Sequence, residues 1–178
     1  QFNEFMFYSD EHWWLRGVAD ACRKLGMRLA IKLHPSETAA NVKLYESLTK
    51  AGDDRVVIVP HGQWPLSELL VACDMMITRD STVVFEANLL DRPSITVNLS
   101  QWDEELPYAD GGGAIGVYHY DDIEPAIASL LHDEAVREHL AACRSGFLTA
   151  HTGPRDGRAT ERICAAIAAY AKPSLPRS

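Results

Sequence analysis

Residues 70–98 constrain the fold more than any other stretch, because two apolar runs of strand length flank one short amphipathic segment. We predict a strand at 75–78, a helix at 81–90 and a second strand at 94–98. Two strands joined by a single crossover helix form a βαβ unit, in which the strands are parallel and helices cover the sheet. This stretch therefore favours an α/β fold.

The same alternation runs through the rest of the chain. Further apolar strands are predicted at 28–33, 55–60 and 114–118. The remaining amphipathic segments predict helices at 10–25, 39–51, 66–73, 122–131, 134–147 and 156–171. Alternating strands and helices with short connections are typical of a Rossmann-like, doubly wound parallel sheet. At 178 residues the chain is long enough for one domain with a real core. We predict that domain at 1–172, followed by a tail at 173–178.

Composition excludes several functional classes. A formal net charge of -8 disfavours a nucleic-acid surface, which needs a basic patch. No apolar run reaches the roughly 20 residues of a membrane-spanning helix, and no signal-peptide pattern opens the chain. The four cysteines follow no metal-binding spacing, so we expect buried, reduced side chains and no metal site. The default compartment is the cytoplasm.

Glycine patterns point away from a standard dinucleotide site. The GxGxxG fingerprint is absent from the sequence. The triple glycine at 111–113 precedes its predicted strand instead of following it. We therefore predict a turn there, at the sheet edge opposite the one where ligands bind.

Polar side chains follow several predicted strands at the point where each strand ends. Lys32 and His34 close the strand at 28–33, His61 follows the next strand, and Ser81 and Thr82 follow the third. The carboxyl ends of parallel strands lie on one edge of the sheet, and this edge is where such folds bind ligands. We therefore expect these side chains to converge on one binding site.

Each of these residues also has a structural interpretation. Ser81 and Thr82 at a helix N-terminus suit a phosphate, yet hydroxyl residues are also ordinary helix caps. His34 before a proline is equally typical of a strand end, and His61 before a glycine is typical of a turn. Lys32 inside an apolar strand favours a partner or a ligand, because a buried lone charge is costly.

Glu86 follows Thr82 by one helical turn, so both side chains are predicted on one helix face. A carboxylate at this position suits hydrogen bonds from a ribose diol. A solvated helix face is the equally simple interpretation.

Three segments in order resemble the C-terminal half of a GT-B glycosyltransferase. They are IKLHPSE at 31–37, SELLVACDMMITRDSTVVFEANLLDRPSITV at 67–97, and DGRATERI at 156–163. The likeness is greatest to the capsule-polysaccharide and CDP-glycerol glycerophosphotransferase-like group, which combines a K-x-HP turn, a hydroxyl pair followed by a glutamate, and a DGKASER-like helix start. The resemblance covers about residues 10–170.

The resemblance implies a binding site for a nucleotide-activated donor that is CDP-, CMP- or UDP-linked, with no further cofactor and no metal. It implies phosphate contacts from His34, with the turn fixed by Pro35 and charge added by Lys32. It also implies phosphate contacts from Ser81 and Thr82, a ribose contact from Glu86, and a position near the base or sugar for His61. One departure is clear: the family usually has an acid and an aromatic residue where this chain has Arg79 and Asp80.

A GT-B enzyme has two Rossmann-like domains, and this chain resembles only one of them. The acceptor site and general base are then expected in an N-terminal domain, and the fragment alone is expected to be inactive. The full protein would transfer a glycosyl or glycerophosphoryl group to a surface or capsular polysaccharide, in the cytoplasm or at the inner face of the membrane. Two alternatives stay open: a UDP-GlcNAc 2-epimerase-like enzyme, and a non-catalytic nucleotide-binding or interaction domain.

Overall fold

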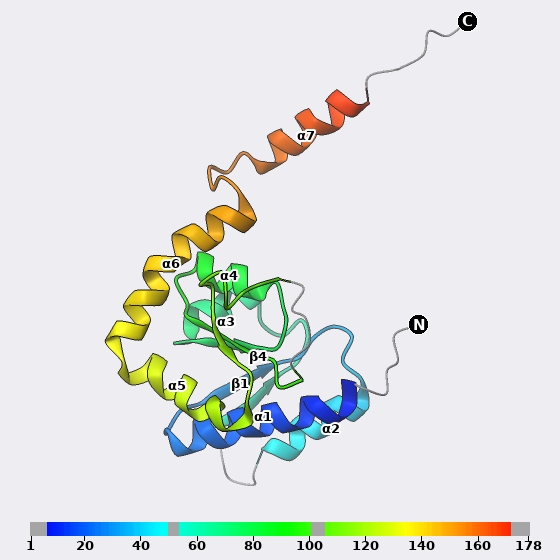
Figure 1. Ribbon diagram of the computed structural model, residues 1–178. Helices are drawn as coiled ribbons and strands as arrows, with labels where there is room; N and C mark the ends of the chain where they lie inside the picture. Colours follow the sequence, from blue (N-terminus) through cyan, green and yellow to red (C-terminus); the bar gives the residue numbers. More distant parts are fainter. Residues whose placement is uncertain (1–6, 50–53, 101–105, 172–178) are drawn as a thin grey trace, which may run out of the picture.

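The computed structural model describes residues 7–49, 54–100 and 106–171, and it alternates strands with helices as the sequence predicts (Figure 1). The strands are β1 (Leu29–Lys32), β2 (Val56–Val59), β3 (Met76–Thr78), β4 (Ser94–Val97) and β5 (Ile115–Val117). The helices are α1 (Phe7–Lys24), α2 (Ala39–Leu48), α3 (Leu66–Ala72), α4 (Val83–Leu89), α5 (Ile123–His132), α6 (Glu134–Thr152), α7 (Ala159–Tyr170) and the 3-10 helix η1 (Tyr120–Asp122). The predicted tail at 173–178 lies outside the described residues.

The strands pair in parallel, but in two hydrogen-bonded groups. β1 pairs with β2, and β4 lies between β3 and β5. The alternation of elements predicts one continuous sheet, so this grouping is a difference from the sequence-based expectation. Side-chain packing connects the groups, because Leu29 of β1 and Ile77 of β3 contact the same hydrophobic cluster as Val18 of α1.

Helices cover both faces of the three-stranded group, which confirms the doubly wound α/β class. On one face, Ile95 and Val97 of β4 pack with residues of α1 and α5, including Val18 and Ile127. On the other face, Met76 packs with α3, α4 and α6 through residues such as Leu70, Val84 and Phe147. The amphipathic character predicted for residues 10–25 is confirmed in α1, since Val18, Ala21 and Cys22 on its inner side are buried.

The β1–β2 pair is covered differently. One of its faces packs Val56 against Leu15 of α1 and against Tyr45 and Leu48 of α2. On the opposite face, the paired residues Ala30 and Val57 are both exposed. This part of the fold is therefore open on one side.

The triple glycine forms the predicted turn, and close packing explains two of its glycines. A Cβ added to Gly113 would lie 2.5 Å from the Phe147 ring, and one added to Gly112 would lie 2.6 Å from Cβ of Cys143. Phe147 is buried and stacks on Phe85 with ring centroids 5.2 Å apart. Asn88 also ties this turn to α4 by donating a hydrogen bond to the Gly113 carbonyl at 2.8 Å.

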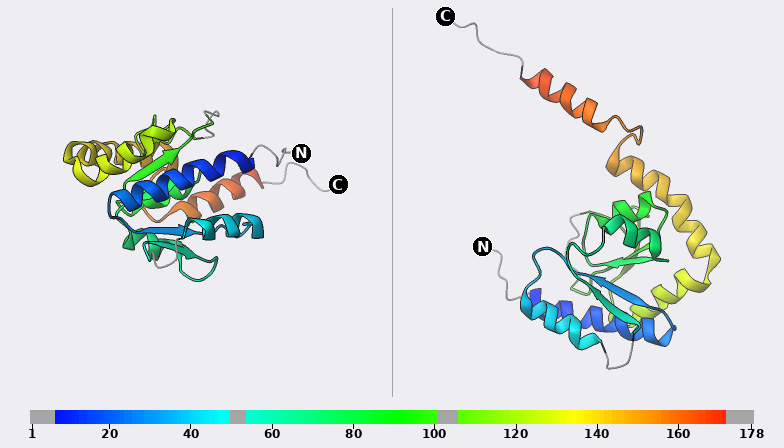
Figure 2. Two further views of the ribbon diagram at one scale, coloured as in Figure 1. Left: turned by 90° about the horizontal axis from the view of Figure 1, so that it is seen from below. Right: turned by 180° about the vertical axis from the view of Figure 1, so that it is seen from behind.

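α7 lies apart from this core. It projects away from the body at the far end of α6, in Figure 1 and in the view from behind in Figure 2. No residue of α7 is buried in the described structure. No helix among the described residues is long and apolar enough to cross a bilayer.

The cysteine expectation is correct only in part. All four thiols are free, and Cys22 is buried. Burial raises the pKa of the Cys22 thiol to about 11, so it stays protonated at neutral pH. Cys73 and Cys143 are only partly buried. Cys164 is exposed, because it lies on α7 and no residue of that helix is buried in the described structure.

We predict that Gly113→Ala destabilises the protein by about 1–3 kcal/mol, the usual cost of overpacking a core. The Phe147 ring cannot move aside because it stacks on Phe85. Gly146→Ala is the matched control, since nothing lies within 4 Å of a Cβ at that exposed position in α6. Better helix propensity should make Gly146→Ala neutral or stabilising by up to about 1 kcal/mol. Urea unfolding measures both, and equal effects of the two variants would contradict this packing.

Candidate functional site

The ends of β1 and β2 lie side by side, and a lysine joins them. Lys32 pairs in register with Val59, and the Leu33 amide donates to the Val59 carbonyl at 3.0 Å. The Lys32 ammonium donates to the Pro60 carbonyl at 3.1 Å. Each strand is followed within two residues by a histidine, His34 or His61. The parallel register therefore delivers Lys32, His34 and His61 to one edge, as predicted.

The ring of His34 has a defined hydrogen-bonding state. Its Nδ1 accepts a hydrogen bond from the Ser36 amide at 3.2 Å and lies 2.7 Å from the Ser36 hydroxyl. A backbone N–H can only donate, so Nδ1 carries no proton and the proton of the neutral imidazole lies on Nε2. His34 is exposed, and its Nε2–H is therefore a hydrogen-bond donor for a ligand at this edge.

The turn that carries His34 is tied firmly to α2. The Glu37 amide donates to the His34 carbonyl at 3.1 Å, which closes the turn around Pro35. The Glu37 carboxylate accepts hydrogen bonds from Asn41 Nδ2 at 2.8 Å and from the Tyr45 hydroxyl at 3.1 Å. These contacts of Glu37 hold the turn that contains Pro35 against α2, and the turn-fixing role of Pro35 itself remains a prediction.

The connection between β3 and α4 differs from the prediction in one detail. The helix was expected to begin at Ser81, but α4 begins at Val83 and has only seven residues. The Ser81 hydroxyl accepts a hydrogen bond from the Val83 amide at 3.3 Å. The helix starts later because this local bond competes with helical geometry at Ser81. Thr82 is the N-cap residue of α4, and Ser81, one residue earlier, has a local structural role because its hydroxyl bonds to the first amide of the helix.

Thr82 and Glu86 remain open to a ligand. The Thr82 side chain is exposed and forms no capping hydrogen bond to α4. Glu86 is also exposed, one helical turn farther along. The two side chains thus lie on the solvent-facing side of α4, as their spacing predicts. Asp80 is exposed as well, whereas Arg79 is partly buried.

The predicted site residues thus form two groups in the structure. Strand register joins Lys32, His34, Pro35 and His61 at the end of the β1–β2 pair. Ser81, Thr82 and Glu86 form the second group, at the end of β3 and the start of α4. Contact of both groups with a single ligand remains a prediction.

The described cavity of about 350 Å³ lies elsewhere, where the turn at 109–114 and the start of β5 meet α6. Its lining is mostly apolar and comes from small or aliphatic residues, with His139 as the one titratable side chain among the lining residues. None of the predicted site residues lines it. Across the described ranges, no cluster of three or more His, Cys, Asp or Glu side chains is placed to hold a metal ion.

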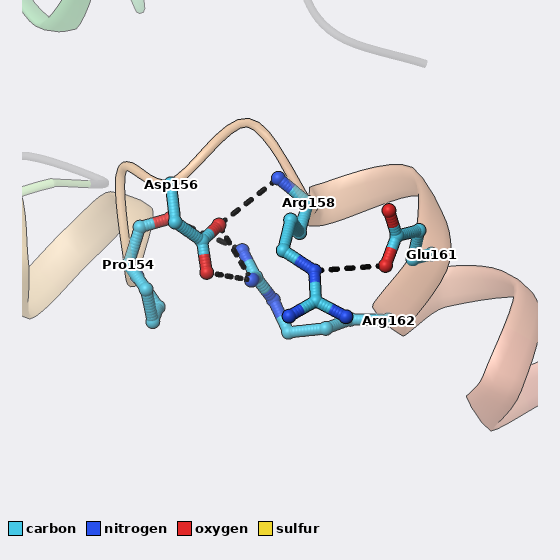
Figure 3. A network of polar contacts seen from close by, with 5 residues as sticks. All are labelled: Pro154, Asp156, Arg158, Glu161 and Arg162. Carbon is cyan, nitrogen blue, oxygen red and sulfur yellow. Dashed lines mark hydrogen bonds and ion pairs between the residues drawn. The ribbon is translucent and has the colours of Figure 1, made fainter.

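The segment at the start of α7 is ordered by charged side chains (Figure 3). Asp156 accepts a hydrogen bond from the Arg158 amide at 3.0 Å and a two-oxygen contact from Arg162 at 2.8 and 2.9 Å. Arg162 also donates to the Pro154 carbonyl at 3.1 Å, and Arg158 pairs with Glu161 at 2.8 Å. The conspicuous DGR sequence thus has a local structural role at the beginning of this helix.

Sequence reasoning places Ser36 at the β1–β2 edge but assigns it no role. In the structure Ser36 sets the tautomer of His34. Trp64 was not considered as a site residue, yet it is 51% exposed just beyond His61. An aromatic residue between a His-Gly turn and a proline was the signal there.

Comparisons with known proteins show the fold. The sequence matches no protein-family model and no curated protein. The structure is similar to UDP-GlcNAc 2-epimerase from Neisseria meningitidis, with a TM-score of 0.61 and 16% identity over 90% of this chain. It is also similar to the spinosyn forosaminyltransferase SpnP, with a TM-score of 0.58 and 18% identity over 93% of this chain. The chain spans only 41% of the length of each, and it has the Rossmann-like fold of one half of a GT-B protein.

The contacts of Asp156 predict a measurable titration. The hydrogen bond from Arg162, followed by that from the Arg158 amide, lowers the pKa of Asp156 below its usual 3.8. Because the pKa of Asp156 is lower in the folded state than in the unfolded state, its ionised carboxylate stabilises the start of α7 at any pH above the unfolded-state pKa. This stabilisation is lost as the pH falls through the lowered, folded-state pKa. We predict that Arg162→Ala returns the pKa of Asp156 toward 3.8, as followed by NMR of the carboxyl carbon.

Arg155→Ala is the matched control, because it removes a neighbouring arginine that forms no hydrogen bond to Asp156 in the described contacts. That variant should leave the titration of Asp156 nearly unchanged. If the pKa of Asp156 rose equally in both variants, the positive charge of nearby arginines in general, and not the Arg162 contact, would set that pKa.

Proposed function

We propose that this chain is the donor-binding half of a GT-B enzyme that uses a nucleotide-activated sugar or polyol phosphate. The observation that carries the proposal is the parallel register of β1 and β2, which holds Lys32, His34 and His61 together at one strand edge. An ammonium group and a fixed imidazole N–H are suited to the oxygens of a diphosphate. The fold shared with two nucleotide-sugar-related proteins supports the same interpretation.

In this proposal the chain stabilises the departing nucleotide. His34 donates its Nε2–H to a phosphate oxygen, and Lys32 adds positive charge beside it. The Thr82 hydroxyl supplies a further donor, Ser81 contributes through the backbone of the turn that precedes α4, and Glu86 accepts from the ribose. Hydrogen-bond donors that are already in position need not reorganise during the reaction, so they stabilise the charge that develops on the leaving group.

The donor class rests on the chemistry of the edge and on the structural neighbours. The meningococcal epimerase was solved bound to UDP-GlcNAc, and SpnP is named as a sugar transferase. We propose a CDP-, CMP- or UDP-linked donor and, from the sequence resemblance, transfer to a capsular or surface polysaccharide. Asp80 would repel a diphosphate, so its carboxylate must point away from the ligand in this arrangement.

The activity of the whole protein requires a second domain in this proposal. The chain covers 41% of each neighbour's length, which leaves room for another domain of similar size. Ile163, Ile167 and Tyr170 follow one another at helical spacing on α7, and all three are exposed. We propose that the N-terminal domain covers this stripe and supplies the acceptor site and the general base.

A UDP-GlcNAc 2-epimerase-like function is the second candidate, because one structural neighbour has that activity in its name. Both candidates place the nucleotide at the same edge, so only a preference for cytidine separates them. Preference for CMP or CDP favours the transferase, whereas preference for UMP or UDP is compatible with the epimerase and with a transferase that uses a UDP-linked donor. Absence of binding at millimolar nucleotide favours a non-catalytic interaction domain.

We predict that His34→Ala and Thr82→Val each weaken binding of the preferred nucleoside diphosphate at least tenfold. A hydrogen bond to a charged group contributes about 1.5–3 kcal/mol, and about 1.4 kcal/mol corresponds to tenfold. Thr82→Val is preferable to a change at Ser81, because the Ser81 hydroxyl accepts a hydrogen bond from the Val83 amide at the start of α4, whereas the Thr82 side chain forms no capping bond. Calorimetric titration measures the affinities.

His132→Ala is the control, since His132 is an exposed histidine in the last turn of α5. It should bind the nucleotide with unchanged affinity. Affinity that stays within about threefold in both site variants would overturn the site assignment, even if the fold is correct.

A further inference from the structure

We propose that the free edges of β1 and β3 are the docking site of one further β-strand, which precedes α1 in the polypeptide of the full protein. The occupant is an extended, mostly apolar segment of about five residues that runs parallel to both edges. Three observations carry the inference: unpaired backbone groups on both edges, the handedness of the connections and the span of α1. It concerns the sheet alone and does not depend on the ligand proposed above.

One edge of β1 has no strand neighbour among the described residues. The Leu29 and Leu33 amides donate hydrogen bonds to carbonyls on the β2 side, at 2.7 and 3.0 Å. Backbone groups of successive residues in a parallel strand face alternate neighbours, so those of Ala30 and Lys32 point away from β2. They are placed to pair with a strand on the other side of β1.

β3 has a matching edge on the side opposite β4, again with no strand neighbour in the described part of the chain. The Met76 amide donates to the Pro93 carbonyl at 2.9 Å, so the backbone groups of Ile77 point away from β4. Side chains next to both edges, Leu29 of β1 and Ile77 of β3, pack against the cluster that contains Val18 of α1. Both edges therefore belong to the layer beneath α1.

The handedness of the connections places a strand linked to α1 on the free edge of β1. α1 and α2 lie on one face of the β1–β2 pair, where Leu15 and Tyr45 pack against Val56. Crossovers between parallel strands are right-handed in about 98% of cases, so successive crossovers on one face advance in one direction along the sheet. The crossover through α2 leads from β1 to β2. A strand that enters β1 through α1 therefore pairs on the side opposite β2.

The same rule turns the free edge of β3 toward that strand. α4 packs on the other face of the sheet, with Val84 in the same cluster as Met76, so the crossover from β3 to β4 advances in the opposite direction. The resulting order is β2, β1, the added strand, β3, β4 and β5, with the described pairs all parallel. Doubly wound sheets commonly have this order, 3-2-1-4-5-6, and the described strands occupy every position except the one numbered 1.

The span of α1 leaves room for one strand. Leu15 packs with Val56 of β2, and Val18, one helical turn farther along, packs with Ile95 of β4. Neighbouring strands are about 4.8 Å apart, so one added strand sets β1 and β3 about 10 Å apart, close to the width of a helix. Because Val18 is buried, side chains close the junction in this structure, and the added strand must part the two groups.

Direct pairing of β1 with β3 and insertion of a strand from a second copy are the rivals. Direct pairing would give one hydrogen-bonded sheet, whereas the described strands form two groups. A second copy would have to thread a strand beneath α1 from outside, whereas a strand joined to α1 reaches the junction through its own connection. An occupant from the same polypeptide is therefore favoured.

The test joins a strand to the N-terminus of the 178-residue chain and follows the hydrogen exchange of single amides by NMR. The added strand is a copy of residues 94–98, because β4 is buried along its whole length. Six residues then separate it from α1, within the range of about 2–6 residues typical of such connections. We expect the Ala30, Lys32 and Ile77 amides to exchange at least about tenfold more slowly than in the unmodified chain. The Met76 amide, which is already bonded at the β4 side, should change less than about twofold.

A matched control is the same fusion with proline in place of the central threonine of the added strand. Proline donates no hydrogen bond to a ladder, so this fusion should leave the exchange of all four amides within about twofold of the unmodified chain. A synthetic peptide of residues 92–99, added in trans to the unmodified chain, should slow the same three amides and repeats the test if the fusion fails to fold. Thermal melting by circular dichroism checks the folding of each form.

Four outcomes would overturn the proposal. Slow exchange of Ala30, Lys32 and Ile77 in the dilute, unmodified chain would show that β1 and β3 pair directly. Slowing that appears only as the concentration of the unmodified chain rises would assign the edges to a second copy. Slowing at β1 but not at Ile77 would place the strand outside the junction, and no slowing by either the fusion or the peptide would remove the docking site. Nucleotide and pyrophosphate are absent throughout, so the result is independent of the proposed donor site.

Discussion

The parallel register between β1 and β2 is the constraint on which the proposed site depends. It sets Lys32 level with Val59 and allows the Lys32 ammonium to reach the Pro60 carbonyl. The turns that follow are then fixed by short-range hydrogen bonds, Ser36 to His34 on one side and Gln63 to Pro60 on the other. A shift of one residue in this register would reverse the faces of all the side chains on one strand. The chemistry at the edge is thus a consequence of strand pairing.

The two strand groups play different parts. The three-stranded group is covered by helices on both faces and contains most of the core. The β1–β2 pair has exposed residues on one face, and its end carries Lys32, His34 and His61. α1 connects them by packing against both groups. α7 forms in another way, through local ion pairs around Asp156 and without burial of its apolar residues.

Much of the fold could be predicted from the sequence because apolar periodicity and turn residues act locally. The stop of α1 is an example: Gly26 has a φ of 70°, and the amides of Gly26 and Met27 close the helix by bonding to Arg23 and Cys22. The separation of the strands into two groups was not predictable, because it depends on how side chains from distant segments pack. The exposure of Cys164 was missed for a similar reason, since its helical spacing gives no information on whether a partner surface exists. For the site, the position of polar residues after parallel strands predicts Lys32, His34 and His61 at one edge, and the register of β1 and β2 is consistent with that placement. The sequence could not show the tautomer of His34 or the hydrogen bond from the Val83 amide to Ser81.

The central claim is that both groups of predicted residues contact one anion. Amide NMR during a titration with inorganic pyrophosphate tests it most directly. The account predicts that the amides of His34, Ser36 and Glu37 and those of residues 80–83 shift together and yield a single dissociation constant. Shifts confined to one of these segments, or two clearly different dissociation constants, would contradict it.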